Sequence, residues 1–579
     1  MVYALACKQR ARNTLNPKPL KGLKKSSMRK ILLIIATGLL FYSCNQAEKE
    51  TADKIYFNAK IWTGDSANAW ADAIAIKGNE IVYVGKDYQS FKGANTQMID
   101  LGGKLMTPGF IDNHTHFLSG GYNLSAVDLR KAKNHQEFIS ILKEFCQRQN
   151  DDRWILGGDW DHEAWGGELP SRSWIDSVTG NHPLFVNRYD GHMALANSKA
   201  LELAGINKNT KVPAGGEMKK DANGEYTGVL KDEAMGLLYK VIPDPSEKEL
   251  DEYLQAAMQH AFENGVTQVH DVASYGGWID LATYRRNYAN KKLDLRIYSF
   301  VPISTWKKLD SFCRKEGKGD DMLRWGALKG FMDGSLGSTT AWFYQPYLDD
   351  PKTSGLNVTD TIDIRNWVLA ADSAGLHIAV HAIGDRANDF ILNVFEEAEK
   401  RNSTDHRFRI EHAQHLTQQA IPRFAQLKVI ASMQPYHAID DGRWAYKRLD
   451  DARLKKTYAF KSLLDAGATL TFGSDWTVAP LKPIQGIYAA VTRRTLDDKN
   501  PNGWYPEQKI SVEQALKCYT ANNAYAGFQE NKLGMLKKGM LADLIVLDEN
   551  IFEIAPEKIK DAKVIRTIVN GKQVFEIKN

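Results

Sequence analysis

The sequence predicts an α/β fold: a (β/α)8 TIM barrel, a flanking β-sandwich formed from both termini, and a subdomain inserted after the first barrel strand. Residues 107–500 alternate strand-like and helix-like patterns, which indicates parallel β/α units. Residues 54–106 and 534–579 instead contain short strand patterns separated by turns, and we expect these two ends to pair in one domain. The 579 residues, 43% apolar and 25% charged, suffice for two or three folding units and exclude wholesale disorder.

Eight strand candidates follow one another in the middle zone once a long insertion is set aside. Eight parallel strands with helices outside them make a barrel, which we place at residues 107–533. Residues from about 122 to 262 are too many for one loop, so we expect them to form the inserted subdomain. Amphipathic helices are expected at 388–400 and 454–466, the second ending before Gly467. The predicted strands are residues 105–116, 267–272, 295–301, 327–333, 377–381, 408–412, 429–434 and 470–475.

The positive charge of the chain is concentrated at its start. Residues 1–43 hold nine Lys and Arg and no Asp or Glu, so removing those nine charges from the net +5 leaves −4. The remainder of the chain therefore shows no electrostatic footprint for nucleic acid, and we expect no nucleic-acid partner.

Residues 1–44 are expected to be a leader. Met28-Arg29-Lys30 is a short basic segment, residues 31–42 are mostly apolar, and Ser43-Cys44 follows. Twelve residues are too few to cross a bilayer, which takes about 20. A secretory signal fits this pattern, and the small residue before Cys44 resembles a bacterial lipoprotein processing site. We expect export to the bacterial cell envelope with lipidated Cys44 as the only membrane contact; a plain signal peptide or an uncleaved anchor is the alternative.

The cysteines predict no disulfide framework. Cys146, Cys313 and Cys518 are widely spaced and odd in number, which favours buried free thiols.

Metal-ligating side chains stand at the ends of several predicted strands. His114 and His116 end the first strand and, being two residues apart, share a face. The active site of a (β/α)8 barrel lies at the carboxyl ends of its strands, so side chains from different strands converge there. Imidazole and carboxylate groups suit zinc and related divalent ions. The converging set is His114, His116, His381, His412 and Asp475, with Lys329 on the fourth strand.

Three further residues are candidates for substrate binding. His270 ends the second strand, Asp333 shares a strand face with Lys329, and Trp160 belongs to an aromatic-rich part of the insertion. Those aromatic side chains form either an apolar roof over the site or the core of the subdomain. His377 is expected in the core, whereas His415 and His437, on expected loops, are further candidates for contacting the substrate or supporting the ligands.

Several motifs resemble the amidohydrolase superfamily, and within it amidohydrolase family 3, over residues from about 54 to the C-terminus. The matching stretches are TPGFIDNHTH at 107–116, KGFMDGSLGS at 329–338, HAIGDRA at 381–387, IEHA at 410–413, GSDW at 473–476 and GMLKKGMLADL at 534–544. The resemblance implies a metal-dependent hydrolase of non-peptide C–N bonds, with the deformylation of N-substituted formamides as an activity of this kind.

The resemblance also implies residue roles. His114 and His116 are similar to ligands of a first metal, with Asp475 close by, and His381 and His412 to ligands of a second or of a sole alternative metal. Lys329 matches a lysine that some relatives carboxylate to bridge two ions; the alternative is an unmodified lysine beside a single ion. Zinc is the expected ion.

The expected mechanism is attack of metal-activated hydroxide on an amide-type carbonyl, with Asp475 passing the proton from water to the leaving nitrogen. A catalytically silent, surface-tethered binding protein is the alternative from another functional class. All the expected ligands are present in the sequence, which a protein without activity would not need to keep. Within enzymes, an N-acyl amino acid deacylase or an ester hydrolase uses the same chemistry. The expected partners are a small-molecule amide-type substrate and a second copy of the chain in a homodimer.

Overall fold

The computed structural model describes residues 50–149, 152–189, 191–272, 276–402 and 404–577. The predicted leader and Cys44 lie outside these residues. No helix among the residues described is long and apolar enough to cross a membrane. Cys146 and Cys518 are buried free thiols and Cys313 is half-buried.

A parallel eight-stranded sheet forms the barrel and confirms the predicted fold class. Between the last strand and the first, the backbone N–H of His116 donates to Trp476 O at 2.6 Å and that of Asp475 to His114 O at 2.7 Å, so the sheet closes. In order around the barrel the strands are β8 (Phe110–Thr115), β15 (Val266–Asp271), β16 (Arg296–Pro302), β17 (Leu323–Phe331), β18 (His377–Ala382), β19 (Arg409–His412), β20 (Ile430–Met433) and β21 (Leu470–Phe472).

The first predicted strand, 105–116, is two strands. β7 (Leu105–Pro108) pairs with sandwich strands, and β8 begins the barrel after Gly109. A Cβ on Gly109 would lie 2.3 Å from Thr267 Cγ2, so only glycine allows this close passage beside β15. The chain therefore changes sheets within a single residue.

Two further sheets pack face to face beside the barrel and contain strands from both ends of the chain. Ile74 and Ile76 of one sheet share a buried cluster with Ile61, Val546 and Ile568 of the other. One sheet has the order β5 (Glu80–Gly85), β4 (Ala73–Lys77), β1 (Lys54–Phe57), β6 (Gln97–Asp100); the other has the order β24 (Lys572–Glu576), β23 (Val564–Val569), β22 (Leu544–Leu547), β7, β2 (Lys60–Trp62), β3 (Trp70–Ala71).

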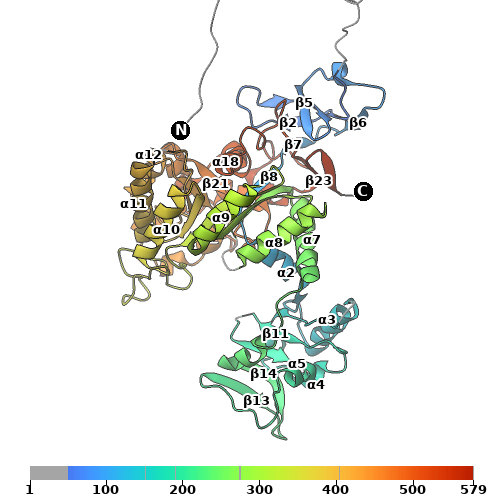
Figure 1. The fold of residues 1–579 in the computed structure, drawn as a ribbon, viewed down its shortest axis with the longest axis vertical. Helices are drawn as coiled ribbons and strands as arrows, with labels where there is room; N and C mark the ends of the chain where they lie inside the picture. The colour runs from blue at the N-terminus through green and yellow to red at the C-terminus, as the bar shows by residue number, and fades with distance from the viewer. Residues whose placement is uncertain (1–49, 150–151, 190, 273–275, 403, 578–579) are drawn as a thin grey trace, which may run out of the picture. The chain divides into compact units, whose positions relative to one another are not determined.

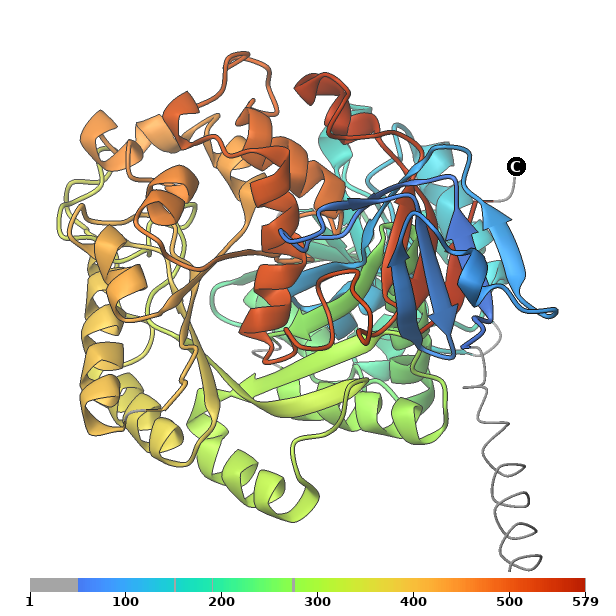
Figure 2. The same ribbon diagram turned by 90° about the horizontal axis from the view of Figure 1, so that it is seen from above.

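Helices surround the barrel (Figure 2). The predicted helix 388–400 lies within α11. The predicted helix 454–466 is wrong: two short helices replace it, because Tyr458 has φ +50° and its carbonyl accepts from the buried Arg493 guanidinium at 3.0 Å. The helices are α2 (Phe117–Ser125), α7 (Glu247–Glu263), α8 (Gly277–Ala289), α9 (Trp306–Glu316), α10 (Thr361–Ser373), α11 (Asp385–Arg401), α12 (Ala420–Gln426), α13 (Pro435–Asp441), α14 (Asp451–Leu454), α15 (Phe460–Asp465), α16 (Pro483–Thr492), α17 (Val512–Tyr519) and α18 (Ala521–Ala526).

The insertion between α2 and α7 has its own sheet and its own core (Figure 1). Trp160 is fully buried in this core beside Phe138 and Leu142, and its indole N–H donates to Val186 O at 2.9 Å. The sheet order is β13 (Gly216–Lys220), β14 (Tyr226–Asp232), β12 (Met193–Ala196), β11 (Phe185–Arg188), β10 (Gly157–Trp160), β9 (Val127–Asp128); the helices are α3 (His135–Gln147), α4 (Arg172–Ile175), α5 (Ser198–Leu203) and α6 (Gly236–Tyr239).

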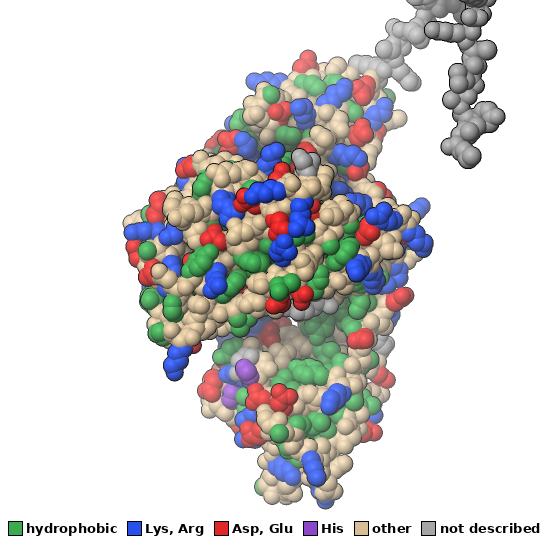
Figure 3. All heavy atoms as spheres, turned by 60° about the vertical axis from the view of Figure 1, so that its left-hand side comes forward, with side chains coloured by type: hydrophobic (Ala, Val, Ile, Leu, Met, Phe, Trp, Pro, Cys, Tyr) green, Lys and Arg blue, Asp and Glu red, His purple; other side chains and the backbone are tan. Residues whose placement is uncertain are grey.

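On the molecular face drawn in Figure 3, Lys and Arg side chains are interspersed with Asp and Glu. Charges of opposite sign so placed weaken one another's long-range field over that face.

Candidate metal centre

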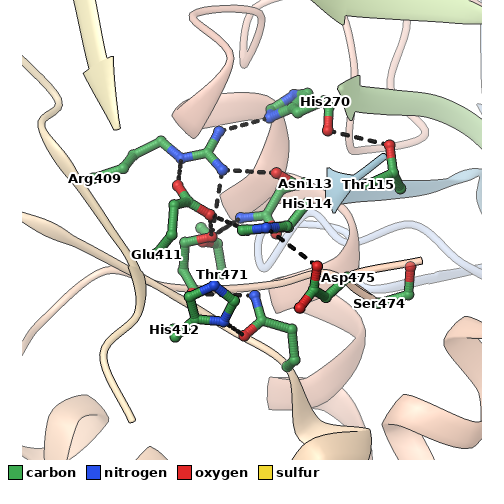
Figure 4. Close-up of polar contacts among 12 residues, drawn as sticks. Asn113, His114, Thr115, His270, Arg409, Glu411, His412, Thr471, Ser474 and Asp475 are labelled. Atoms are coloured by element: carbon green, nitrogen blue, oxygen red, sulfur yellow. Dashed lines mark hydrogen bonds and ion pairs between the residues drawn. The ribbon is translucent and has the colours of Figure 1, made fainter. Parts of the chain in front are cut away.

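Three side chains from the carboxyl ends of barrel strands converge in the interior. His114 of β8, His412 of β19 and Asp475 after β21 are buried, and one ligand atom of each lies within 4.8 Å of the others (Figure 4). Asp475 Oδ1 is 3.5 Å from His114 Nε2 and 3.2 Å from His116 Nε2. His381 of β18 adjoins the group, its ring centroid 4.5 Å from that of His412.

Protonation in the cluster suits metal binding. Burial lowers the pKa of His114 to about 4 and that of His381 to about 3, so both imidazoles are neutral at pH 7. Burial alone would raise the pKa of Asp475, but the neighbouring histidines hold it well below its usual value. Neutral imidazole and ionised carboxylate are the forms that ligate divalent ions.

Two backbone distortions help to assemble the cluster. His412 has φ +74° and Asp475 has φ +58°, a left-handed region that non-glycine residues rarely enter. In a regular strand Glu411 and His412 would point to opposite faces. The turned backbone at His412 lets both side chains reach the centre, and such strain is typical of functional sites.

Glu411 holds His114 from the side opposite Asp475. Glu411 Oε2 lies 2.5 Å from His114 Nδ1 and accepts from Ser432 Oγ at 2.6 Å, while Arg409 Nε donates to Oε1 at 2.7 Å (Figure 4). All four residues are buried. A proton on Nδ1, shared with the carboxylate, leaves the Nε2 lone pair of His114 directed at Asp475.

The donor set fits a divalent metal ion. His114 Nε2 is a buried atom with no hydrogen-bond partner among the residues described, a costly state that a bound ion would relieve. His412 is oriented in the same manner, because its Nδ1 lies 2.8 Å from Gln434 Oε1 and its Nε2 is left for another contact.

Lys329 of β17 is close enough to the cluster for the charges of Glu411 and Asp475 to affect its pKa. Its side chain is buried, and Nζ lies 4.8 Å from the centroid of the Phe331 ring. Burial lowers the pKa of Lys329 to about 8, although Glu411 and Asp475 favour its charged form. Among the described residues, no carboxylate lies within ion-pair distance of this ammonium.

The three predicted substrate-binding residues occupy different places. Asp333 accepts backbone N–H groups from Trp342, Ile383 and Gly384 at 2.8–2.9 Å, and its Oδ1 lies 3.5 Å from His381 Nε2, so it braces the loops around that histidine. His270 Nδ1 accepts from Arg409 Nη1 at 3.0 Å and supports the arginine. The structure does not bring Trp160 to the cluster, because this residue fills the core of the insertion.

His377 and His415 are core residues. His377 lies 3.0 Å from Tyr298 Oη and 2.9 Å from Arg407 O, as expected for a core histidine. His415, expected on a loop, is buried with Nδ1 2.8 Å from Thr457 Oγ1.

Sequence reasoning missed Glu411, Arg409 and Gln434. Glu411 precedes His412 in the IEHA stretch, but strand alternation assigns the two to opposite faces, and the positive φ that overrides this is not visible in a sequence. The sequence did contain one signal: Arg409 and Glu411 are two residues apart and share one face of a predicted strand. Two opposite charges on a buried strand are expected to form an ion pair.

A parallel barrel whose mouth gathers histidines and an aspartate defines a metal-dependent hydrolase by fold and site. Residues 97–575 match the amidohydrolase family, and the chain belongs to it. Over 90% of its length it is 40% identical to the protein LONG AFTER FAR-RED 3 of Arabidopsis thaliana, of which the alignment covers 92%. It is 27% identical to the N-substituted formamide deformylase of Arthrobacter pascens, covering 90% of this chain and 98% of that one. An uncharacterized metal-dependent hydrolase from Pyrococcus furiosus superposes with a TM-score of 0.71 at 29% identity, covering 86% and 100% of the two chains.

Proposed function

We propose that the protein hydrolyses a C–N bond other than a peptide bond, in a small molecule of the amide or N-formyl type. The observation that carries this proposal is the buried cluster of His114, His412 and Asp475, with the unpartnered Nε2 of His114 directed into it. The relative named as a deformylase of N-substituted formamides supports the choice of bond.

His114, His116, His412 and Asp475 would hold the metal ion, for which zinc is the expected identity. His381 adjoins this set, but its Nε2 lies 3.0 Å from Gly334 O, an acceptor that competes for the ring nitrogen. The geometry favours one ion with unmodified Lys329. Two ions would call for a carboxylated Lys329 as the bridge, and metal content per chain separates these cases.

The side chains around the metal ion would have different roles in the reaction. A divalent ion held by these residues would act as a Lewis acid and would lower the pKa of a water molecule to about 7. Asp475 is ionised and takes the proton from the attacking water, then delivers it to the leaving nitrogen as the C–N bond breaks. Glu411 and Gln434 keep His114 and His412 in fixed orientations throughout, so that little reorganisation accompanies the reaction.

We also propose export and lipid attachment at Cys44, on the basic, apolar and Ser43-Cys44 pattern of the leader. Intact-mass measurement of the membrane-bound protein, compared with a Cys44→Ser variant, tests this proposal. The predicted homodimer stays a prediction, to be checked by sedimentation.

The test of the activity uses protein expressed from residue 45 onward without chelators. Metal content is measured by plasma mass spectrometry, and release of formate or carboxylate is followed for a panel of N-formyl and N-acyl amides, with N-acyl amino acids and esters as competing classes. We expect about one ion per chain and turnover of amides. Protein that binds no zinc, manganese or iron, or turns over only esters, contradicts the proposal.

A further inference from the structure

We propose that His437 is a further catalytic residue, which donates a hydrogen bond from its imidazole Nε2 to the substrate oxygen that becomes negatively charged during hydrolysis. This inference rests on the proposed function and adds a residue to its site. His437 transfers no proton in this role, because it keeps its N–H while Asp475 moves the proton.

The position of His437 follows from the barrel. Strand β20 ends at Met433, and α13 begins at Pro435, so His437 lies in the first turn of a helix at the carboxyl end of the seventh strand. Groups at this end of each strand face the active site in (β/α)8 enzymes. Proline at the first helical position fixes the start of this helix, so the ring is presented from rigid backbone.

The direction of the ring follows from its contacts. Nε2 of His437 lies 3.9 Å from Asp475 Oδ2, and the ring is within 12° of parallel to that of His412 with centroids 6.4 Å apart. The distance to Asp475 is too long for a hydrogen bond, since N–H···O bonds span about 2.7–3.2 Å. The side chain keeps 14% of its surface exposed, so part of the ring is accessible from solvent.

Nε2 of His437 is buried and has no hydrogen-bond partner among the residues described. A buried polar nitrogen left unpaired costs roughly 1–3 kcal/mol, and in the tautomer with the proton on Nε2 an oxygen of a bound substrate would relieve this cost. Asp475 has its Oδ1 engaged by His116 at 3.2 Å, and its Oδ2 is the oxygen that faces His437. A carbonyl carbon attacked by a water that Asp475 deprotonates would thus place its oxygen within reach of His437.

A hydrogen-bond donor in a fixed position suits this task. A donor preorganised in a dry site stabilises developing negative charge at no cost of reorientation, and loss of one such donor costs about 10²–10³ in kcat. A histidine that polarises a substrate carbonyl is an established pattern in another (β/α)8 enzyme.

The experiment compares His437→Ala and His437→Gln with the wild type, on a substrate found in the amide panel. We expect both variants to keep the wild-type metal content and melting temperature, and His437→Ala to lose about 10²–10³ in kcat with KM changed much less. The glutamine variant, whose amide N–H donates, should recover part of this loss. The pH dependence of kcat should keep its shape, because no proton transfer has been removed.

Asp440→Asn on the same helix is the matched control, since Asp440 forms an ion pair with Arg443 and is not one of the proposed metal ligands; it should leave kcat unchanged. Loss of metal in the His437 variants would make the residue a ligand and overturn the inference, as would wild-type kcat in both. If the wild type hydrolyses an amide and the His437 variants have the same kcat, only the role of His437 is overturned. If the wild type hydrolyses none of the amides, the proposed function is overturned and the inference with it.

Discussion

His114 Nδ1 lies 2.5 Å from Glu411 Oε2, so the imidazole directed at Asp475 is held by a buried carboxylate on its other side. Arg409 neutralises that carboxylate and is itself held by Asn113 O at 2.7 Å and by His270. The orientation of His114 thus depends on a chain of polar contacts that runs down the barrel interior.

Glu411→Gln should weaken metal affinity about 10–100-fold, because His114 loses the carboxylate that fixes its tautomer. The same change leaves the buried charge of Arg409 without the carboxylate that neutralises it, which should lower the free energy of unfolding by about 3–5 kcal/mol. Adding Arg409→Met should recover much of the stability and none of the metal affinity. Chelator competition and urea unfolding separate the two effects. Glu397→Gln on the surface is the control, and equal affinity in Glu411→Gln and the wild type would remove Glu411 from the site.

Asp475→Asn should keep metal on the three histidines and lose about 10²–10⁴ in turnover, since the amide cannot accept the proton from water. Metal content and kcat are measured on the same sample. Asp498→Asn, at an exposed ion pair with Arg494, is the control. An Asp475→Asn variant that binds metal and turns over near the wild-type rate contradicts the role of this residue.

Lys329 predicts a pH dependence of stability in the metal-free protein. Its pKa is lowered from 10.5 to about 8 by burial, so between these values the unfolded chain binds the proton and the folded one does not. The free energy of unfolding should therefore rise between pH 8 and 10.5, by about 3 kcal/mol from this group. The measured quantity is the difference in the free energy of unfolding between the wild type and Lys329→Met, in carbon dioxide-free buffer. The contributions of other titrating groups cancel in this difference. A difference that stays flat across this window contradicts the lowered pKa.

Gly473→Ala should disturb the metal centre through packing alone. A Cβ at this position would lie 2.6 Å from the backbone N of His114 and 2.8 Å from its Cβ, where β21 passes β8. Overpacking of this kind costs about 1–3 kcal/mol, and here the displaced residue is a ligand. We expect a lower melting temperature and weaker metal binding. Gly236→Ala, whose Cβ would meet nothing within 4 Å, should change neither quantity. Equal melting temperatures and metal affinities in the two variants would refute the argument.

The barrel and the convergence of His114, His412 and Asp475 could be predicted because buried parallel strands are continuous apolar runs that end in polar residues at one edge. The break at Gly109 could not, because a glycine within an apolar run leaves the strand pattern unchanged. The interruption at Tyr458 depends on Arg493, which is far away in sequence. Glu411 requires a backbone turn at His412 that local periodicity does not reveal.

The change of sheets at Gly109 brings the N-terminal strand β7 into contact with residues near the other end of the sequence. β7 pairs with β22, the N–H of Gly109 donates to Asp543 O at 3.0 Å, and Asp543 forms a buried ion pair with Arg296 at 2.8 Å. The strand that carries His114 is therefore anchored by residues that are far away in the sequence. A substitution in β22 that weakens these contacts can therefore displace the first of the predicted ligands from a position outside the barrel.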